Sequence, residues 1–98
     1  MGSYVKDNYL RVETIRKAMD DFNRSSSEKV SFYKVYDRSY FKPKWKERHN
    51  ILCYKNLKII ATNEMKTIWR IENEKHNILL KSSLTNCFAW IKENSNEV

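Results

Sequence analysis

The sequence has only one glycine and one proline among 98 residues, which excludes collagen-like, linker-like and low-complexity classes. It has no apolar run near the roughly 18 residues that a membrane-spanning helix needs, and no apolar signal-peptide segment at its N-terminus. Its two cysteines, Cys53 and Cys87, lack metal-ligand spacing and lie in apolar surroundings. We therefore expect both to be free thiols that behave as small buried hydrophobes, in a cytoplasmic protein with no metal site and no membrane contact.

Residues that carry enzyme chemistry are scarce. The acidic residues are scattered, and the only glycine, Gly2, cannot form a phosphate-cradling loop. Of the two histidines, His76 is expected to be exposed in a hairpin turn, and neither lies in a catalytic constellation. We expect no cofactor, no catalytic residue and no enzyme. A small ribonuclease is the alternative, with a phosphate held by His49, Arg48, Arg70 and Tyr54.

The chain does have enough apolar material for a core, since 41% of its residues are hydrophobic. Its length is that of one domain, so we expect residues 1–98 to form a single small domain with flexible ends at 1–3 and 94–98. The formal net charge of +7 favours an anionic partner over a neutral one.

The first segment has the spacing of an amphipathic helix. One apolar face is formed by Val5, Tyr9, Val12, Ile15, Met19 and Phe22. Asp7 is the predicted N-cap, and the serines at 25–27 are predicted to end the helix, because serine competes for backbone hydrogen bonds. A helix lying on a sheet is the expected arrangement, and a short coiled-coil dimer is the alternative.

The middle of the chain predicts strands. Val30–Tyr36 is rich in β-branched and aromatic residues, and four further short runs follow at 51–54, 57–62, 67–72 and 77–81. Their two- to four-residue connections imply antiparallel neighbours. Because glycine is nearly absent, we expect the asparagines in these connections to adopt the left-handed turn conformations. In the run 67–72, Arg70 is predicted to point away from the face that holds Trp69 and Ile71.

The last segment predicts a second helix, because Leu84, Cys87, Phe88 and Ile91 follow helical spacing after a capping Ser82 or Ser83. The fold class is therefore α+β: an N-terminal amphipathic helix, an antiparallel sheet of about four to five strands with a long basic loop, and a C-terminal helix packed on the sheet. This order is similar in topology to double-stranded-RNA-binding domains. The start of the second helix, Ser82–Asn86, lacks that family's basic cluster, and the family's glycine-containing loop is missing, so we do not assign the chain to it.

The segment from Lys34 to His49 interleaves basic and aromatic residues. Lys and Arg neutralise phosphates, aromatic faces stack on unpaired bases, and Arg can bond guanine in a groove. Lys58 and Arg70 could extend the same positive surface if one sheet face is open. The predicted contact residues are Arg38, Tyr40, Lys42, Lys44, Trp45, Lys46, Arg48 and His49.

These observations predict a small basic regulatory protein that binds DNA or RNA through this loop. The alternative is a protein-directed inhibitor or adaptor that docks the same loop on an acidic partner surface, because Tyr, Trp and Arg are also enriched at protein interfaces. The abundance of Lys, Asn, Ile and Ser is typical of AT-rich coding sequences, which are common in viral and mobile genomes. A third interpretation is that the aromatic residues only pack beneath a solvated lysine face.

Overall fold

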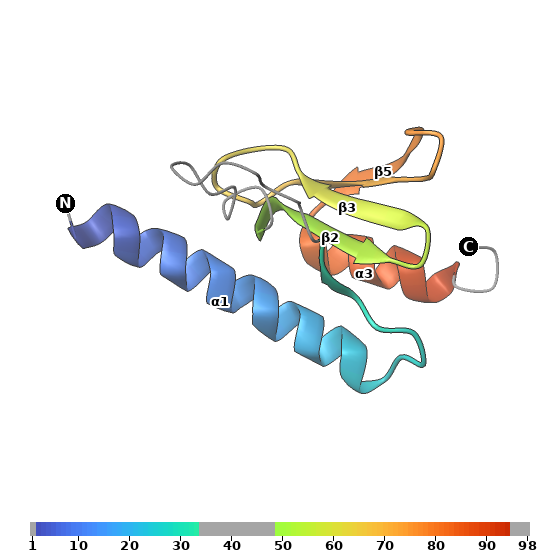
Figure 1. Cartoon of the computed structure of the whole chain (residues 1–98), viewed down its shortest axis with the longest axis horizontal. Coiled ribbons are helices and arrows are strands. Elements are labelled where there is room, and N and C mark those ends of the chain that lie inside the picture. Colours follow the sequence, from blue (N-terminus) through green and yellow to red (C-terminus); the bar gives the residue numbers. More distant parts are fainter. Residues whose placement is uncertain (1, 34–48, 95–98) are drawn as a thin grey trace, which may run out of the picture.

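The computed structural model describes residues 2–33 and 49–94, and for residues 2–10 it describes the backbone alone. The fold is α+β, as predicted, with two long helices and one antiparallel five-stranded sheet in the described chain (Figure 1). The elements are α1 (Gly2–Arg24), β1 (Ser31–Phe32), β2 (Ile51–Tyr54), β3 (Leu57–Ala61), β4 (Trp69–Glu72), β5 (Ile78–Ser82) and α3 (Leu84–Glu93).

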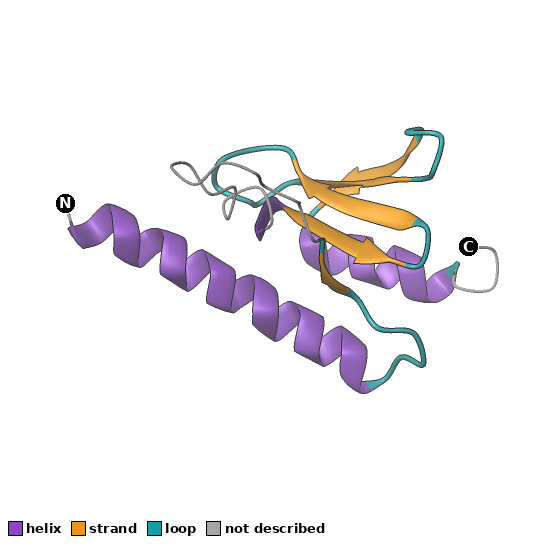
Figure 2. Ribbon diagram, viewed as in Figure 1, coloured by secondary structure: helices purple, strands orange, loops and turns teal. Residues whose placement is uncertain are grey.

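The sheet is a meander in which each strand pairs with its neighbour in the sequence, in the order β1-β2-β3-β4-β5. Both helices pack against the same face of this sheet (Figure 2). The predicted strands β2 to β5 are confirmed, and each pairs antiparallel with its neighbour. Their direction follows from the short connections, because parallel neighbours need a long crossover. The predicted strand Val30–Tyr36 is confirmed only at β1, where the Tyr33 amide extends the pairing by donating to the Ile51 carbonyl at 2.9 Å. Residues 34–36 lie outside the description.

The expectation that asparagines take the left-handed conformations is wrong. Among the described non-glycine residues, positive φ occurs at Lys55, Lys66 and His76. The asparagines act through their side chains instead. The Asn73 Oδ1 atom accepts hydrogen bonds from the amides of Lys75 and Asn77, each at 2.9 Å, and Asn63 plays the same role between β3 and β4. A side-chain acceptor thus closes each turn, which is a second reason for asparagine in turns.

The helix ends agree in part with the predictions. Helix α1 ends at Arg24 and Ser25 follows it, as expected, but the helix begins at Gly2, so Asp7 lies inside it and is not its N-cap. The sequence places the helix start at Asp7 because the first turn, which begins at Gly2, has neither a capping side chain nor an acidic residue to mark it. Helix α3 is capped by Ser83, whose hydroxyl accepts from the Asn86 amide at 3.2 Å.

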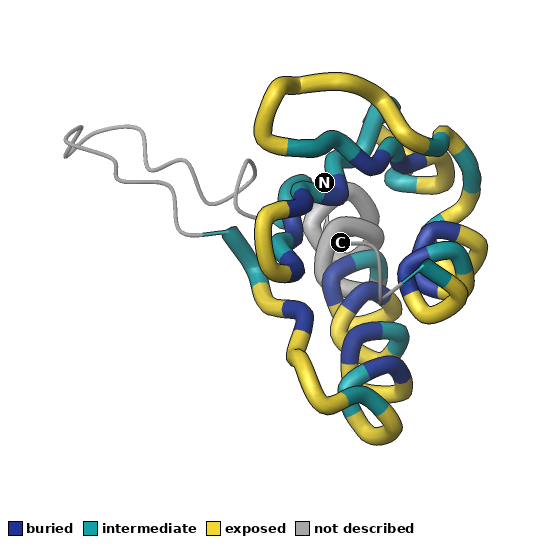
Figure 3. The backbone as a smooth tube through the Cα atoms, turned by 90° about the vertical axis from the view of Figure 1, so that its right-hand side faces the viewer, coloured by how far each residue is buried: buried dark blue, intermediate teal, exposed yellow. Residues whose placement is uncertain are grey.

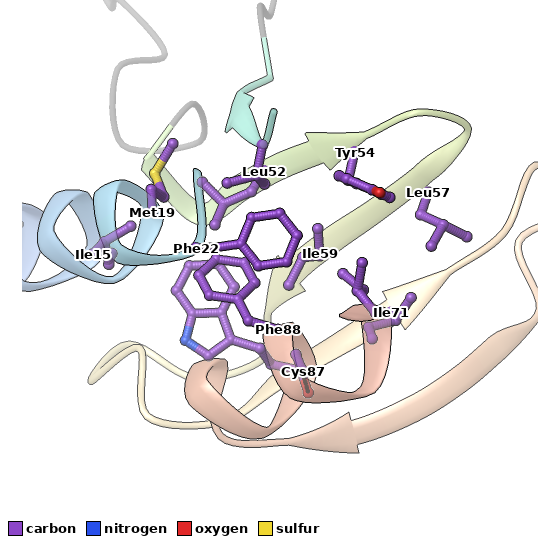
Figure 4. Close-up of a cluster of buried hydrophobic side chains, with 13 residues drawn as sticks. Ile15, Met19, Phe22, Leu52, Tyr54, Leu57, Ile59, Ile71, Cys87 and Phe88 are labelled. Atoms are coloured by element: carbon purple, nitrogen blue, oxygen red, sulfur yellow. Dashed lines mark hydrogen bonds between the residues drawn. The ribbon is translucent and has the colours of Figure 1, made fainter. Parts of the chain in front are cut away.

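The core lies between the helices and the sheet (Figure 4). Val12, Ile15 and Met19 are buried, as their spacing predicts. The Phe22 ring of α1 packs 5.1 Å from the Phe88 ring of α3 and meets the Tyr54 ring edge-on at 5.6 Å. In Figure 3, buried and exposed residues alternate along each helix, as expected for helices with one face on a sheet.

The two cysteines are both free, as predicted, but only one belongs to the core. Cys87 is fully buried beneath β4, and burial raises the pKa of its thiol to about 11. Cys53 is half-buried, and its sulfur lies 3.2 Å from the Ser31 hydroxyl. Because Cys53 alternates with the buried Leu52 and Tyr54, it faces away from the helices, which corrects the prediction that it is a core residue.

Candidate partner-binding surface

The predicted contact segment lies largely outside the described residues. This applies to Arg38, Tyr40, Lys42, Lys44, Trp45, Lys46 and Arg48, so their role stays a prediction. The two residues that flank the segment, Tyr33 and His49, are described. They mark the two ends of the segment.

The sheet face opposite the helices carries a distinct set of side chains, which we call the outer face. On β3 and β4, buried residues alternate with half-buried ones, so Lys58, Ile60, Arg70 and Glu72 point away from the helices. The strand register aligns them in two rows. One row runs from Ser31 through Cys53 and Lys58 to Glu72, and the other runs from Tyr33 through Ile51, Ile60 and Arg70 to Lys81.

Tyr33 joins the predicted contact segment to the outer face. The Lys58 ammonium lies over the Tyr33 ring, 4.7 Å from its centre, which is the geometry of a cation–π contact. Tyr33 is also the last described residue before the segment 34–48. An aromatic ring and a cation from the outer face therefore stand beside the point where the basic segment begins.

An acidic residue lies among the cations of the outer face. The Glu72 carboxylate pairs with the Arg70 guanidinium, and its other oxygen lies 3.6 Å from the Nδ1 atom of His76. The Glu72 side chain is 12% exposed, whereas the His76 side chain is 85% exposed, so His76 is the exposed turn histidine that the sequence predicts. Glu72 thus offsets the charge of Arg70, and Lys58 and Lys81 supply the remaining positive charge of the outer face.

A shallow hollow of about 520 Å³ opens on this face. Its walls come from the end of β1, the β2–β3 hairpin and the β4–β5 turn, and they include Tyr33, Cys53, Lys58, Glu72 and His76. Aromatic, cationic and anionic groups thus meet at one place. The hollow can accept a group that both stacks and forms hydrogen bonds.

His49 lies at the helix side of β1. Its ring meets the Phe32 ring at 5.5 Å with an interplanar angle of 62°. Phe32 packs against the hydrophobic core, and the Arg16 guanidinium of α1 lies 5.8 Å from the centre of its ring. The predicted contact residue His49 is therefore half-buried in an aromatic and cationic cluster.

The ribonuclease-like grouping of His49, Arg48, Arg70 and Tyr54 is not assembled. Tyr54 is buried on the helix side of the sheet, where it contacts Phe22, while Arg70 points from the outer face. Two residues that point from opposite faces of one sheet cannot hold the same phosphate. Within residues 2–33 and 49–94, no group of His, Cys, Asp and Glu is arranged to hold a metal ion.

Sequence reasoning found Lys58 and Arg70 and placed Glu72 beside Arg70, but it missed Tyr33 and Lys81 as members of the same surface. The alternation along β4 does place Glu72 on the side of Arg70. Lys81 could not be placed, because the pairing of β4 with β5 shifts register between Ile71 and Glu72. Tyr33 could not be placed either, because Lys34 interrupts the apolar alternation of the predicted strand 30–36.

Neither a protein-family model, a curated protein nor a solved structure matches the chain. These comparisons give no positive indication of an enzyme activity. Among the described helices, none is long and apolar enough to cross a membrane.

Proposed function

We propose that this chain is a small nucleic-acid-binding regulatory protein. The contact residues predicted within the basic aromatic segment 34–49 form the contact surface together with the outer face. The observation that carries the proposal is the position of Tyr33 and Lys58, which place an aromatic ring and an ammonium group of the sheet directly beside the start of the basic segment. The net charge of +7 supports an anionic partner.

The chemistry of this surface suits phosphates and bases. Lys42, Lys44 and Lys46 alternate with other residues, so an extended backbone would direct three ammonium groups to one side. Lys58 and Lys81 would continue the positive charge across the sheet. Each phosphate contact releases condensed counterions, which makes binding steeply dependent on salt.

Neutralising the loop lysines tests the first part of the surface. In the triple variant Lys42→Gln, Lys44→Gln, Lys46→Gln, we expect the fold to be intact and binding to DNA and RNA to weaken across sequences. The slope of log affinity against log salt should fall by about 0.9 for each duplex phosphate contact that is lost. Normal binding by this folded variant, or salt-insensitive binding by the parent, would contradict the proposal.

A second pair of variants tests the outer face. Lys58→Gln with Lys81→Gln removes two positive charges from the outer face, and Lys17→Gln with Arg24→Gln removes two from exposed positions on α1. The two double variants have the same net charge. Only the first should lower the affinity and the salt slope markedly if the outer face contacts phosphates. Equal losses would mean that net charge alone governs binding.

An inhibitor or adaptor that binds an acidic protein surface is the alternative for the same residues. The two functions differ in their response to bare nucleic acid. If the parent shows no salt-sensitive binding to DNA or RNA, and one protein is retained from a nuclease-treated lysate, the inhibitor function replaces the one proposed here. Loss of that protein in the triple-lysine variant would locate its contact on the same loop.

A further inference from the structure

Lys58 and Glu72 are direct neighbours in the hollow of the outer face. Strands β3 and β4 pair with Lys58 opposite Glu72, so both side chains leave the same face of the sheet, with their Cβ atoms about 4.5–5.5 Å apart. Both residues line the hollow of about 520 Å³, a volume within the range of about 300–1,000 Å³ that holds small ligands. A hydrogen-bond donor and an acceptor therefore stand side by side where a ligand group can enter.

Both groups keep hydrogen-bonding capacity for a ligand. The Lys58 ammonium lies 4.7 Å from the centre of the Tyr33 ring, which orients the ammonium, and it has three N–H donors. The Glu72 carboxylate pairs with Arg70 through Oε2. Its Oε1 atom is 3.6 Å from the Nδ1 atom of His76, which is longer than the about 2.7–3.2 Å of a hydrogen bond. Because a carboxylate has about four acceptor sites, both oxygens can accept further hydrogen bonds.

We propose that this hollow binds an unpaired guanine base, an inference that rests on the proposed nucleic-acid-binding function and specifies its ligand. The Watson–Crick edge of guanine presents the O6 acceptor followed by two adjacent donors, N1–H and N2–H. The Lys58 ammonium donates to O6, and the Glu72 carboxylate accepts from both N–H groups. This edge is accessible only where the base is not paired, so the ligand is single-stranded.

The other bases complement this pair of side chains less well. Adenine and cytosine each present one amino group beside an acceptor ring nitrogen, so only one oxygen of the Glu72 carboxylate receives a donor. Uracil and thymine place a carbonyl on each side of N3–H, and one of these carbonyls would face the carboxylate. Since a bidentate contact discriminates strongly between bases, we expect guanine to be preferred by at least about fivefold.

Substituted bases test the inference on the unaltered full chain. Fluorescence anisotropy would compare thymine oligonucleotides that carry guanine, inosine, 7-deazaguanine, adenine or cytosine at one central position. Guanine and 7-deazaguanine should bind equally well, because both have the complete Watson–Crick edge. Inosine lacks the N2 amino group and should bind more weakly than guanine. Pairing the guanine oligonucleotide with its complement should abolish the preference for guanine over the other bases.

Glu72→Gln should remove the preference, because an amide offers one acceptor oxygen and directs a donor at the donors of guanine. Its affinity for the guanine-free oligonucleotide should not fall, since the variant loses a negative charge. Glu64→Gln is the matched control. It removes the same charge from an exposed position in the β3–β4 connection, at the other end of β3, and should keep the preference. Circular dichroism would establish that both variants are folded.

The outcomes separate this inference from the proposed function. Equal affinity of the parent for all the oligonucleotides would overturn the guanine site and leave the proposed function intact, whereas no binding to any of them would overturn both. A preference that 7-deazaguanine loses would mean that the base is recognised through N7, which contradicts the assigned edge. A preference that survives in Glu72→Gln, or that Glu64→Gln removes equally, would also overturn the inference. The comparison of guanine with inosine needs no variant, so it does not depend on the folding of Glu72→Gln.

Discussion

The side-chain amide of Asn23 holds both backbone polar groups of Val30. Its Oδ1 atom accepts from the Val30 amide at 2.8 Å, and its Nδ2 atom donates to the Val30 carbonyl at 3.0 Å. Val30 is buried and lies just before β1, where the ladder of the sheet has not yet begun. The Asn23 side chain thus makes the two hydrogen bonds that a neighbouring strand would make with Val30, and it holds the chain in place between α1 and β1.

Replacing Asn23 by Ala should destabilise the fold. The change removes partners from a buried donor and acceptor, and each unsatisfied group costs about 1–3 kcal/mol. Urea unfolding would measure the difference. Arg24→Ala is the control, because Arg24 is exposed and its ion pair with Asp21 is solvated, so it should change the free energy of unfolding by less than about 1 kcal/mol. Equal stability of Asn23→Ala and the parent would contradict the assigned role.

Replacing Ile15 by Ala should also be costly, for a different reason. Ile15 is 3% exposed at the interface between α1 and the sheet, so truncation leaves a cavity and should cost about 2–5 kcal/mol. Glu13→Ala changes an exposed position on the same helix and should stay within about 0.5 kcal/mol of the parent. An unchanged unfolding midpoint for Ile15→Ala would mean that this face is not packed.

The Cys87 thiol should make stability fall at alkaline pH. Burial raises its pKa in the folded protein from the ordinary value of 9.0 to about 11. The unfolded state therefore releases this proton first, so the contribution is complete below pH 9 and is lost as the pH rises toward 11. Unfolding free energies across this range should fall less steeply for Cys87→Ala than for the parent. The same slope in both proteins would contradict the assignment.

Trp45 offers a test that separates binding from packing. If Trp45 stacks on a base, Trp45→Ala should weaken single-stranded ligands by about 1–3 kcal/mol, with little effect on duplex affinity or on the salt slope. Fluorescence anisotropy with matched single-stranded and duplex probes would measure both. A fall in thermal stability together with a loss of all binding would show instead that Trp45 packs in the protein.

The sequence carried enough information for the architecture because its signals are local and repeated. The helical spacing of Ile15, Met19 and Phe22 fixes one face of α1, and the alternation along β4 separates Arg70 from Trp69 and Ile71; both faces were assigned correctly. Short connections then restricted the strands to antiparallel neighbours. The first residues of α1 were not predicted, since neither a cap nor an acidic first turn marks Gly2 as a helix start.

The composition of the candidate surface was harder to foresee, because it depends on registers between strands. Lys58 lies opposite Glu72, and Arg70 opposite Lys81, only because of the β3–β4 and β4–β5 pairings. The contact of Lys58 with Tyr33 crosses from β3 over β2 to the end of β1. The spacing of residues within one segment cannot predict a contact between side chains of different strands. The charge of the segment 34–48, in contrast, can be read directly from the sequence.

The meander order of the strands also has a consequence for folding kinetics. Every strand pairs with the strand next to it in the sequence, so the hairpins from β2 to β5 can form without closing a long loop. The packing of Phe22 on Phe88 is different, because it joins α1 to α3 and bears a larger loop-closure entropy than any of these hairpins. Refolding should accordingly be fast for a sheet protein, with the docking of α1 on α3 as the late event.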